Sequence, residues 1–219
     1  MTNFLPVNKL LLNGIYFVYK FNRSDEALEL NLFIKKLGLL PDICIEDYLV
    51  NFFETLYFKR LGVTALDPIL LRFEHLRILN LSFNKIQKIE HLPPNLKELY
   101  LTGNLVENVE GKCDSLIHLG LSYNRIRNYS LFDIAELYPN LFCLDVSFND
   151  IDNMAYAMEY LKKLASLKML YLVGNPLVLT NHYRDIIKQN LTNLLYIDNI
   201  KAFADSESPK KRKKRLADL

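Results

Sequence analysis

The sequence predicts an α/β solenoid, a stack of short repeats with one parallel sheet on its concave side, a helical closure at the N-terminal end and a cap at the C-terminal end. Two observations predict this architecture. Half of the residues are hydrophobic and 24% are charged, which suits a chain that folds around a core. The pattern L-x-x-L-x-L-x-x-N-x-L also recurs at spacings of 20, 20, 25 and 26 residues, and such a unit buries its apolar face only against its neighbours. The five copies begin at Leu76, Leu96, Leu116, Leu141 and Leu167.

The repeated pattern is the leucine-rich repeat. In each copy the L-x-L segment predicts a short strand, because alternate side chains of a strand point to the same face. A degenerate copy precedes the five at Phe53, Leu56 and Phe58, and a truncated copy follows at Leu194 and Ile197. The asparagine of each full copy turns the chain out of the strand, and its amide can bond backbone groups that the stack would otherwise orphan. These asparagines form a predicted structural ladder of Asn84, Asn104, Asn124, Asn149 and Asn175.

The convex side of the solenoid depends on the length of each repeat. Repeats of 20 residues leave room only for extended or 3₁₀ segments, whereas longer repeats can hold a helix. Apolar residues at helical spacing over 154–164 predict one such helix. Residues 1–52 predict the helical N-terminal closure, and the segment 42–60 predicts a second helix that runs into the degenerate strand. Residues 53–199 hold the repeats and the C-terminal cap, and residues 200–219 are predicted to be a basic disordered tail.

Charge is distributed unevenly along the chain. The formal net charge is +2, yet residues 201–219 carry seven Lys/Arg against three Asp/Glu, a balance of +4 that leaves −2 for the remainder. The near-neutral body disfavours binding to a phosphate backbone. A basic run of this kind is typical of a nuclear-import signal or of a contact with an acidic partner such as tubulin. The run consists of Lys210, Lys211, Arg212, Lys213, Lys214 and Arg215.

Composition excludes several classes of protein. The three cysteines are irregularly spaced and include no C-x-x-C pair, which argues against a disulfide framework and a zinc site. No uncharged run approaches the roughly 20 residues of a membrane-spanning helix, and no signal peptide is recognised, so we expect a cytoplasmic protein without a membrane partner. The sequence contains neither a G-x-x-x-x-G-K-[ST] loop nor a G-x-S-x-G elbow. We therefore expect no enzymatic activity, no cofactor and no small-molecule substrate.

The residues between the buried leucines predict the binding surface. Strands of a parallel sheet lie about 4.8 Å apart, so equivalent positions of successive repeats form columns on the concave face. Aromatic residues recur at the fifth and eighth positions of the pattern, and such side chains commonly anchor protein interfaces. Few Lys or Arg side chains alternate with these rings, which disfavours a nucleic-acid partner. The candidate partner-binding residues are Tyr57, Phe83, Tyr100, Tyr123, Phe148, Tyr171, Glu98 and His118.

Two other interpretations of these columns stay open. The third position places Glu98, His118 and Cys143 side by side, a composition that suits a metal site or a Cys–His pair. A flat sheet approximates a tetrahedron poorly, so a polar row within the binding surface is the favoured interpretation and no metal is expected. Phe83 and Phe148 each precede a ladder asparagine, and the alternative for these two is a half-buried structural side chain at the strand exit.

Four segments resemble the leucine-rich repeat-containing protein 43 family. They are L-P-P-N-L-K-E-L-Y-L-T-G-N at 92–104, S-L-I-H-L-G-L-S-Y-N at 115–124, Y-P-N-L-F-C-L-D-V-S-F-N at 138–149 and L-V-G-N-P-L-V-L-T-N-H-Y-R at 172–184. The resemblance implies a non-enzymatic protein of the axoneme of motile cilia, in a family whose known members are much longer. The chain from 175 to 198 also resembles the C-terminal cap of short leucine-rich repeat proteins. That resemblance implies a helix around 183–190 that covers the last strand.

The sequence thus predicts a non-enzymatic scaffold that binds a partner protein on its concave face. The repeat geometry indicates the mode of binding, and the family resemblance implies a location in a motile cilium or flagellum, within an axonemal complex. The alternative is a nuclear adaptor in a ribonucleoprotein or phosphatase complex, which the basic run favours.

Overall fold

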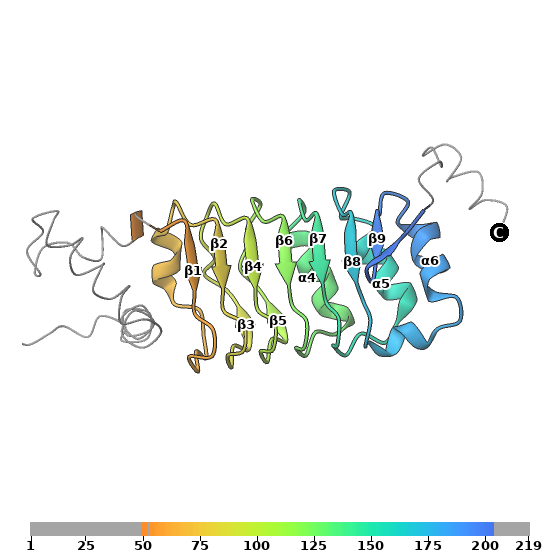
Figure 1. Cartoon of the computed structure of the whole chain (residues 1–219), viewed down its shortest axis with the longest axis horizontal. Helices are drawn as coiled ribbons and strands as arrows, with labels where there is room; N and C mark the ends of the chain where they lie inside the picture. Colours follow the sequence, from red (N-terminus) through yellow and green to blue (C-terminus); the bar gives the residue numbers. More distant parts are fainter. Residues whose placement is uncertain (1–49, 52, 204–219) are drawn as a thin grey trace, which may run out of the picture.

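The structure is a computed structural model that describes residues 50–51 and 53–203 of the chain. The predicted closure within 1–49 and the basic run at 210–215 lie outside the described residues. Figure 1 shows a row of strands along the long axis of the molecule, with helices behind the strands of the C-terminal half and at its end. None of the described helices is long and apolar enough to cross a membrane.

One eight-stranded sheet runs through the whole array. Its strand order is β1-β2-β4-β6-β7-β8-β9-β10, and every neighbouring pair is parallel except β9 and β10. Both incomplete repeats contribute, the degenerate copy as β1 and the truncated copy as β9, as predicted. Because β1 occupies Thr55–Tyr57, the helix expected over 42–60 does not extend through these residues. The strands are Thr55–Tyr57 (β1), Ile78–Asn80 (β2), Glu98–Tyr100 (β4), His118–Gly120 (β6), Cys143–Asp145 (β7), Met169–Tyr171 (β8), Tyr196–Ile197 (β9) and Ile200–Lys201 (β10).

The middle residue of each repeat strand faces the core. Leu79, Leu99, Leu119 and Leu144 have no exposed surface, and each lies in register with the next along the sheet. Burial of a leucine side chain stabilises a fold by about 1.5–3 kcal/mol. The residues on either side of each leucine point to the opposite face, which is the concave face and is turned away from the helices.

Repeat length determines what forms the convex side, as the sequence predicts. The 20-residue repeats return through two-residue strands, β3 (Lys88–Ile89) and β5 (Asn108–Val109), which pair in a small second sheet. The longer repeats carry helices or 3₁₀ turns. These are η1 (Pro68–Arg72), α4 (Asn128–Leu137), α5 (Met154–Leu161), η2 (Pro176–Leu179) and α6 (Tyr183–Asn190).

Two of these helices were predicted individually. The helix expected over 154–164 is α5, which begins at the N-cap Asn153, whose side chain accepts a bond from the backbone N–H of Tyr156 at 3.0 Å. The helix expected around 183–190 is α6. The boundaries of α4 were not predicted, because its N-cap position holds Arg127 rather than one of the usual small polar residues.

The predicted asparagine ladder is present in all five full repeats. Asn124 illustrates it: its Nδ2 donates to the carbonyls of Leu101 at 2.9 Å and Leu121 at 3.0 Å, and its Oδ1 accepts from the N–H of Val106 at 2.9 Å. One amide thus bonds the strand exit of its own repeat and that of the repeat before. The other four asparagines make equivalent bonds.

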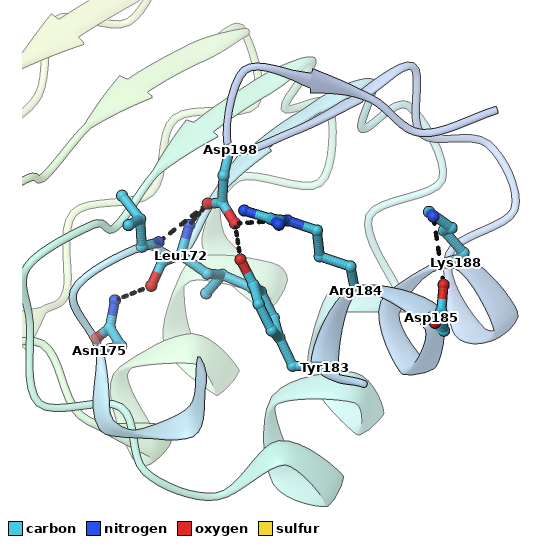
Figure 2. A network of polar contacts seen from close by, with 8 residues as sticks. Leu172, Asn175, Tyr183, Arg184, Asp185, Lys188 and Asp198 are labelled. Carbon is cyan, nitrogen blue, oxygen red and sulfur yellow. Dashed lines mark hydrogen bonds and ion pairs between the residues drawn. The ribbon is translucent and has the colours of Figure 1, made fainter. Parts of the chain in front are cut away.

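An aspartate ends the ladder at the C-terminal cap (Figure 2). In earlier repeats the N–H of the sixth position donates to a backbone carbonyl of the next strand, as Val146 does to Tyr171 at 3.0 Å. At the last repeat a side chain replaces that carbonyl, because Asp198 Oδ1 accepts from the N–H of Leu172 at 2.7 Å and of Val173 at 3.0 Å. Its Oδ2 accepts from the Tyr183 hydroxyl of α6 at 2.6 Å, which fastens the helix to the end of the sheet.

The cap continues past residue 199, where the sequence placed its end. Ile200 and Lys201 form β10, which runs antiparallel to β9. Ala202 is buried, and its N–H donates to the carbonyl of Leu195 at 2.8 Å. The basic composition of 201–219 suggested a tail that begins at 200, whereas the backbone pairing keeps these first residues in the cap.

Candidate binding face

The predicted columns lie on the concave face in the expected order. Glu98 is in register with His118, and His118 with Cys143, so the polar row crosses β4, β6 and β7. Tyr100 is in register with Gly120 in the fifth-position column. The repeat pattern predicts which positions of neighbouring strands pair. It does not predict the exposure or the contacts of each side chain.

The eighth-position column adopts a left-handed backbone conformation throughout. Non-glycine residues seldom adopt a positive φ, yet Phe83 has a φ of 61°, Tyr123 of 55° and Phe148 of 52°. Gly103 and Gly174 occupy the same position with φ of 68° and 79°. The left-handed turn delivers the following asparagine into the stack and directs the aromatic side chain outwards.

The aromatic side chains of this column keep about half of their surface exposed at the strand exit. Phe83 is 49% exposed, Tyr123 57% and Phe148 43%. About half of each side chain is thus exposed, so both the partner-binding role and the structural role stay open for Phe83 and Phe148. Part of each of these two rings is covered by the glycine of the following repeat, Gly103 for Phe83 and Gly174 for Phe148.

Neighbouring side chains hold these rings in position. The Arg60 guanidinium lies 5.1 Å from the centroid of the Phe83 ring. The rings of Tyr123 and Phe148 stack with centroids 4.3 Å apart and an interplanar angle of 6°. The column thus presents aromatic side chains that are already held in position, and such pre-organisation lowers the entropy cost of forming an interface.

The fifth-position tyrosines differ in their exposure. Tyr57 is 54% exposed, whereas Tyr100 and Tyr171 are half-buried. The Tyr100 hydroxyl donates to Glu98 Oε2 at 2.7 Å, and burial together with this bond raises the pKa of Tyr100. Burial also raises the pKa of Tyr171. Glu98 therefore orients a neighbouring ring.

The polar row does not carry the chemistry of a Cys–His pair. Burial raises the pKa of the Cys143 thiol to about 11, so the thiol stays protonated at neutral pH. Burial lowers the pKa of His118 despite the nearby carboxylates of Glu98 and Asp145, and its ring lies 4.9 Å from that of Tyr100. No three His, Cys, Asp or Glu side chains are grouped to hold a metal ion within residues 50–51 and 53–203.

An apolar pair at the start of the central strands was not predicted from the sequence. Ile117 is 41% exposed and Phe142 is 45% exposed, immediately before β6 and β7. They lie on adjacent repeats, since the N–H of Phe142 donates to the carbonyl of Ile117 at 2.8 Å. The second position of the pattern holds Lys or Arg in three other repeats. The change to apolar residues at 117 and 142 could have indicated this pair in the sequence.

Comparison with known proteins agrees with this geometry. A family model described as "Leucine Rich repeat" matches residues 74–88. Leucine-rich repeat-containing protein 43 of Mus musculus and of Homo sapiens are each 35% identical to the chain over 177 residues, 77% of its length. The chain belongs to the leucine-rich repeat-containing protein 43 family.

The chain is much shorter than these leucine-rich repeat-containing protein 43 relatives. It spans 26% of the length of the mouse protein and 27% of the human one. Among solved structures it is similar to TLR13 in the TLR13–ssRNA13 complex, with a TM-score of 0.50 and 21% identity, over 66% of this chain and 22% of that one. A likeness at this identity shows the solenoid fold alone.

Proposed function

We propose that this leucine-rich repeat chain is a non-enzymatic scaffold that grips a segment of a partner protein on its concave face. The observation that carries the proposal is the exposed aromatic column at the strand exits. Its rings are large, apolar, outward-facing and already held in place by stacking. Buried aromatic side chains are the usual anchors of protein interfaces.

The central two repeats form the strongest part of this face. Stacked Tyr123 and Phe148 lie at the exits of β6 and β7, and exposed Ile117 and Phe142 lie at their starts. Half-buried polar groups such as His118 occupy the strands between them. A partner segment that lies along the strands can therefore bury apolar surface at both ends of a more polar strip.

The charges on this face favour protein over nucleic acid. Strand-forming residues contribute the carboxylates Glu98 and Asp145, which repel phosphate groups. At the second position, Arg77 directs Nη1 to the carbonyls of Glu74 at 3.0 Å and Asn95 at 3.3 Å, so part of its hydrogen-bonding capacity is used within the chain. Aromatic surface without a basic groove suits a polypeptide.

The proposed place of action is the axoneme of motile cilia or flagella. Membership of the leucine-rich repeat-containing protein 43 family supports this location. The geometry of the concave face favours neither the axoneme nor the nucleus. A tagged form of the 219-residue chain should concentrate in the axoneme of ciliated cells. Uniform nuclear staining would instead favour the nuclear adaptor.

A pair of matched variants tests the concave face. We expect the double variant Tyr123→Ala/Phe148→Ala to stay folded, because both side chains are exposed, and to lose partners that wild type captures from ciliated-cell extract. Each anchor should contribute more than about 1 kcal/mol of binding. The control is Leu179→Ser, which alters a side chain that is 85% exposed in η2. Quantitative mass spectrometry and circular dichroism on the same preparations give the readout. If the folded double variant captures every wild-type partner at control levels, the interface lies elsewhere.

A further inference from the structure

The outward side of α4 is aromatic where a surface helix is normally polar. Its core-facing residues include Leu131 and Ile134, which have no exposed surface. On the opposite side, Tyr129 is 47% exposed and Phe132 is 44% exposed. Exposed positions of an amphipathic helix usually hold charged or polar residues, so these rings call for an explanation other than core formation.

The neighbouring helix α5 repeats this feature. Tyr156 is 45% exposed, and Tyr160 follows one turn later on the same side. The Tyr160 ring meets Phe132 of α4 edge-on, with centroids 5.3 Å apart at 77°, and meets Tyr156 at 5.1 Å and 61°. The rings of two helices thus form one continuous surface.

This surface is separate from the concave face. We define the α4–α5 outer face by the four rings Tyr129, Phe132, Tyr156 and Tyr160 and by the charged residues Asp133, Glu136, Glu159 and Lys163 that alternate with them. Figure 1 shows α4 and α5 behind the strands, on the side opposite the concave face. Contiguous exposed apolar surface of this kind marks an interaction site in soluble proteins.

The surrounding charge is negative. The segments that form this face, 128–137 and 154–163, carry three carboxylates against two lysines, a balance of −1 in a chain whose net charge is +2. On the outer face, Asp133 lies half-buried, and its pKa is raised by burial and by the nearby carboxylate of Glu110. Glu159 follows Tyr156 by three residues on α5, which places both on one side of the helix.

One side chain of the protein already shows which group this face accepts. The Lys163 ammonium lies 5.2 Å from the centroid of Phe132 and 5.5 Å from that of Tyr160. It also pairs with Glu136 Oε1 at 2.5 Å. An ammonium held between two aromatic faces and a carboxylate is a cation–π site, and the same types of group continue towards Tyr129 and Tyr156.

We propose that the α4–α5 outer face binds a lysine- and arginine-rich segment of a partner protein. Cations of that segment stack on the exposed faces of Tyr156 and Tyr129 and pair with Asp133 and Glu159, next to the position that Lys163 occupies. The proposal does not depend on the concave face, because the two surfaces share no residue. The scaffold would then hold two partners at once, one on each side.

A labelled oligoarginine peptide is the probe for this face, and a neutral oligoglutamine peptide of equal length is its control. Fluorescence anisotropy at low salt should show binding of the oligoarginine alone, and the affinity should fall as salt is added. The double variant Phe132→Ala/Tyr156→Ala should bind about five- to tenfold more weakly, from the loss of two cation–π faces. The double variant Asp133→Asn/Glu159→Gln should bind more weakly and with a reduced salt dependence.

Matched controls separate this face from the rest of the molecule. The concave variant Tyr123→Ala/Phe148→Ala should bind oligoarginine as wild type does. A chain that ends at Phe203 lacks basic residues 210–215, and the ratio between wild-type and Phe132→Ala/Tyr156→Ala affinities should persist in it. Circular dichroism checks the fold of each variant. Equal affinity of the folded aromatic variant and wild type, or equal binding of the neutral peptide, would overturn the proposal.

Discussion

Each ladder asparagine satisfies backbone groups of two repeats at once. Its amide donates to two carbonyls and its oxygen accepts at least one N–H, and all these groups lie where the strands end inside the stack. Serine or aspartate could not reproduce this set, since neither offers two N–H donors together with a carbonyl acceptor. The asparagine side chain therefore bonds the backbone groups that strand pairing leaves unpaired at the strand exit.

Asn124→Ala should lower the free energy of unfolding by roughly 1–3 kcal/mol, because two carbonyls and the N–H of Val106 lose their partner. Urea denaturation followed by circular dichroism measures the change. The matched control is Asn108→Ala, which alters an exposed asparagine in β5. Equal midpoints for the two variants would contradict the role assigned to the ladder.

The glycines of the eighth-position column serve both the backbone and the aromatic rings. A Cβ added to Gly103 would lie 2.8 Å from Cδ1 of Phe83, in addition to the strain of a φ of 68°. Gly62 has a φ of 71°, but no atom lies within 4 Å of its added Cβ. An alanine at Gly62 would therefore cost backbone strain alone, whereas an alanine at Gly103 would also displace the Phe83 ring.

Gly62→Ala should cost about 1–2 kcal/mol, the usual penalty for a left-handed alanine. Gly103→Ala should cost more, since the Phe83 ring must also move. Phe83→Ala in the Gly103→Ala background should remove the part of the cost that comes from displacing the ring. Thermal unfolding of wild type, the two single variants and the double variant measures this part as a coupling energy. An additive result would show that the ring does not depend on Gly103.

His118 makes stability depend on pH. Its pKa is lowered in the folded protein, chiefly by burial, whereas an unfolded histidine titrates near 6.5. The unfolded chain therefore binds more protons as the pH falls through about 6.5, and the free energy of unfolding decreases with it. His118→Gln should lose less stability than wild type between pH 7 and pH 5. Parallel curves for the two proteins would exclude this contribution.

At the scale of elements, the cap shows how a helix can close a parallel sheet. The Asp198 carboxylate takes over the acceptor role of a missing strand and also binds the Tyr183 hydroxyl of α6. Burial and this bond raise the pKa of Tyr183 to about 12, so the hydroxyl remains a donor at neutral pH. The Arg184 guanidinium adds an ion pair, with Nε 3.8 Å from Oδ2.

Asp198→Ala should destabilise the chain by about 2–4 kcal/mol, since it leaves the N–H groups of Leu172 and Val173 without their acceptor and releases α6. Hydrogen exchange should increase first in β8 and α6. The control is Asp185→Ala on the same helix, where the exposed pair with Lys188 contributes less than about 1 kcal/mol. Equal losses for the two variants would contradict the capping role.

Elements differ in how visible they are in the sequence. The repeat strands and the ladder follow from periodic leucine and asparagine, which burial and backbone hydrogen bonding require at fixed positions. The boundaries of α4 do not follow, because Arg127 gives no N-cap signal and the outward rings obscure its amphipathic pattern. The left-handed backbone conformation of Phe83 could not be predicted from the sequence either, since glycine is the only residue type in that column that is typical of positive φ.

At the scale of the whole molecule, each repeat contacts mainly its neighbours, and stability depends on how the two ends are closed. The sequence could place the repeats, yet it set the end of the cap at 199 because charge composition changes there. The strand β10 is two residues long and depends on backbone pairing, which side-chain patterns do not report. Backbone hydrogen bonds, rather than charge composition, therefore determine where the cap ends and the tail begins.

Two truncations test where the folded molecule ends. A chain that ends at Phe203 keeps β10 and the buried Ala202 and should unfold at the wild-type temperature. A chain that ends at Asn199 loses the pairing of Ile200 with Ile197, the bond from the N–H of Ala202 to Leu195, and the apolar contact of Ala202 with the core. Each kcal/mol lost lowers the midpoint by about 2–4 °C in a domain of this size, so differential scanning calorimetry resolves the difference. Equal midpoints for the two truncated chains would return the boundary to 199, whereas a lowered midpoint for the longer one would place residues after 203 in the cap.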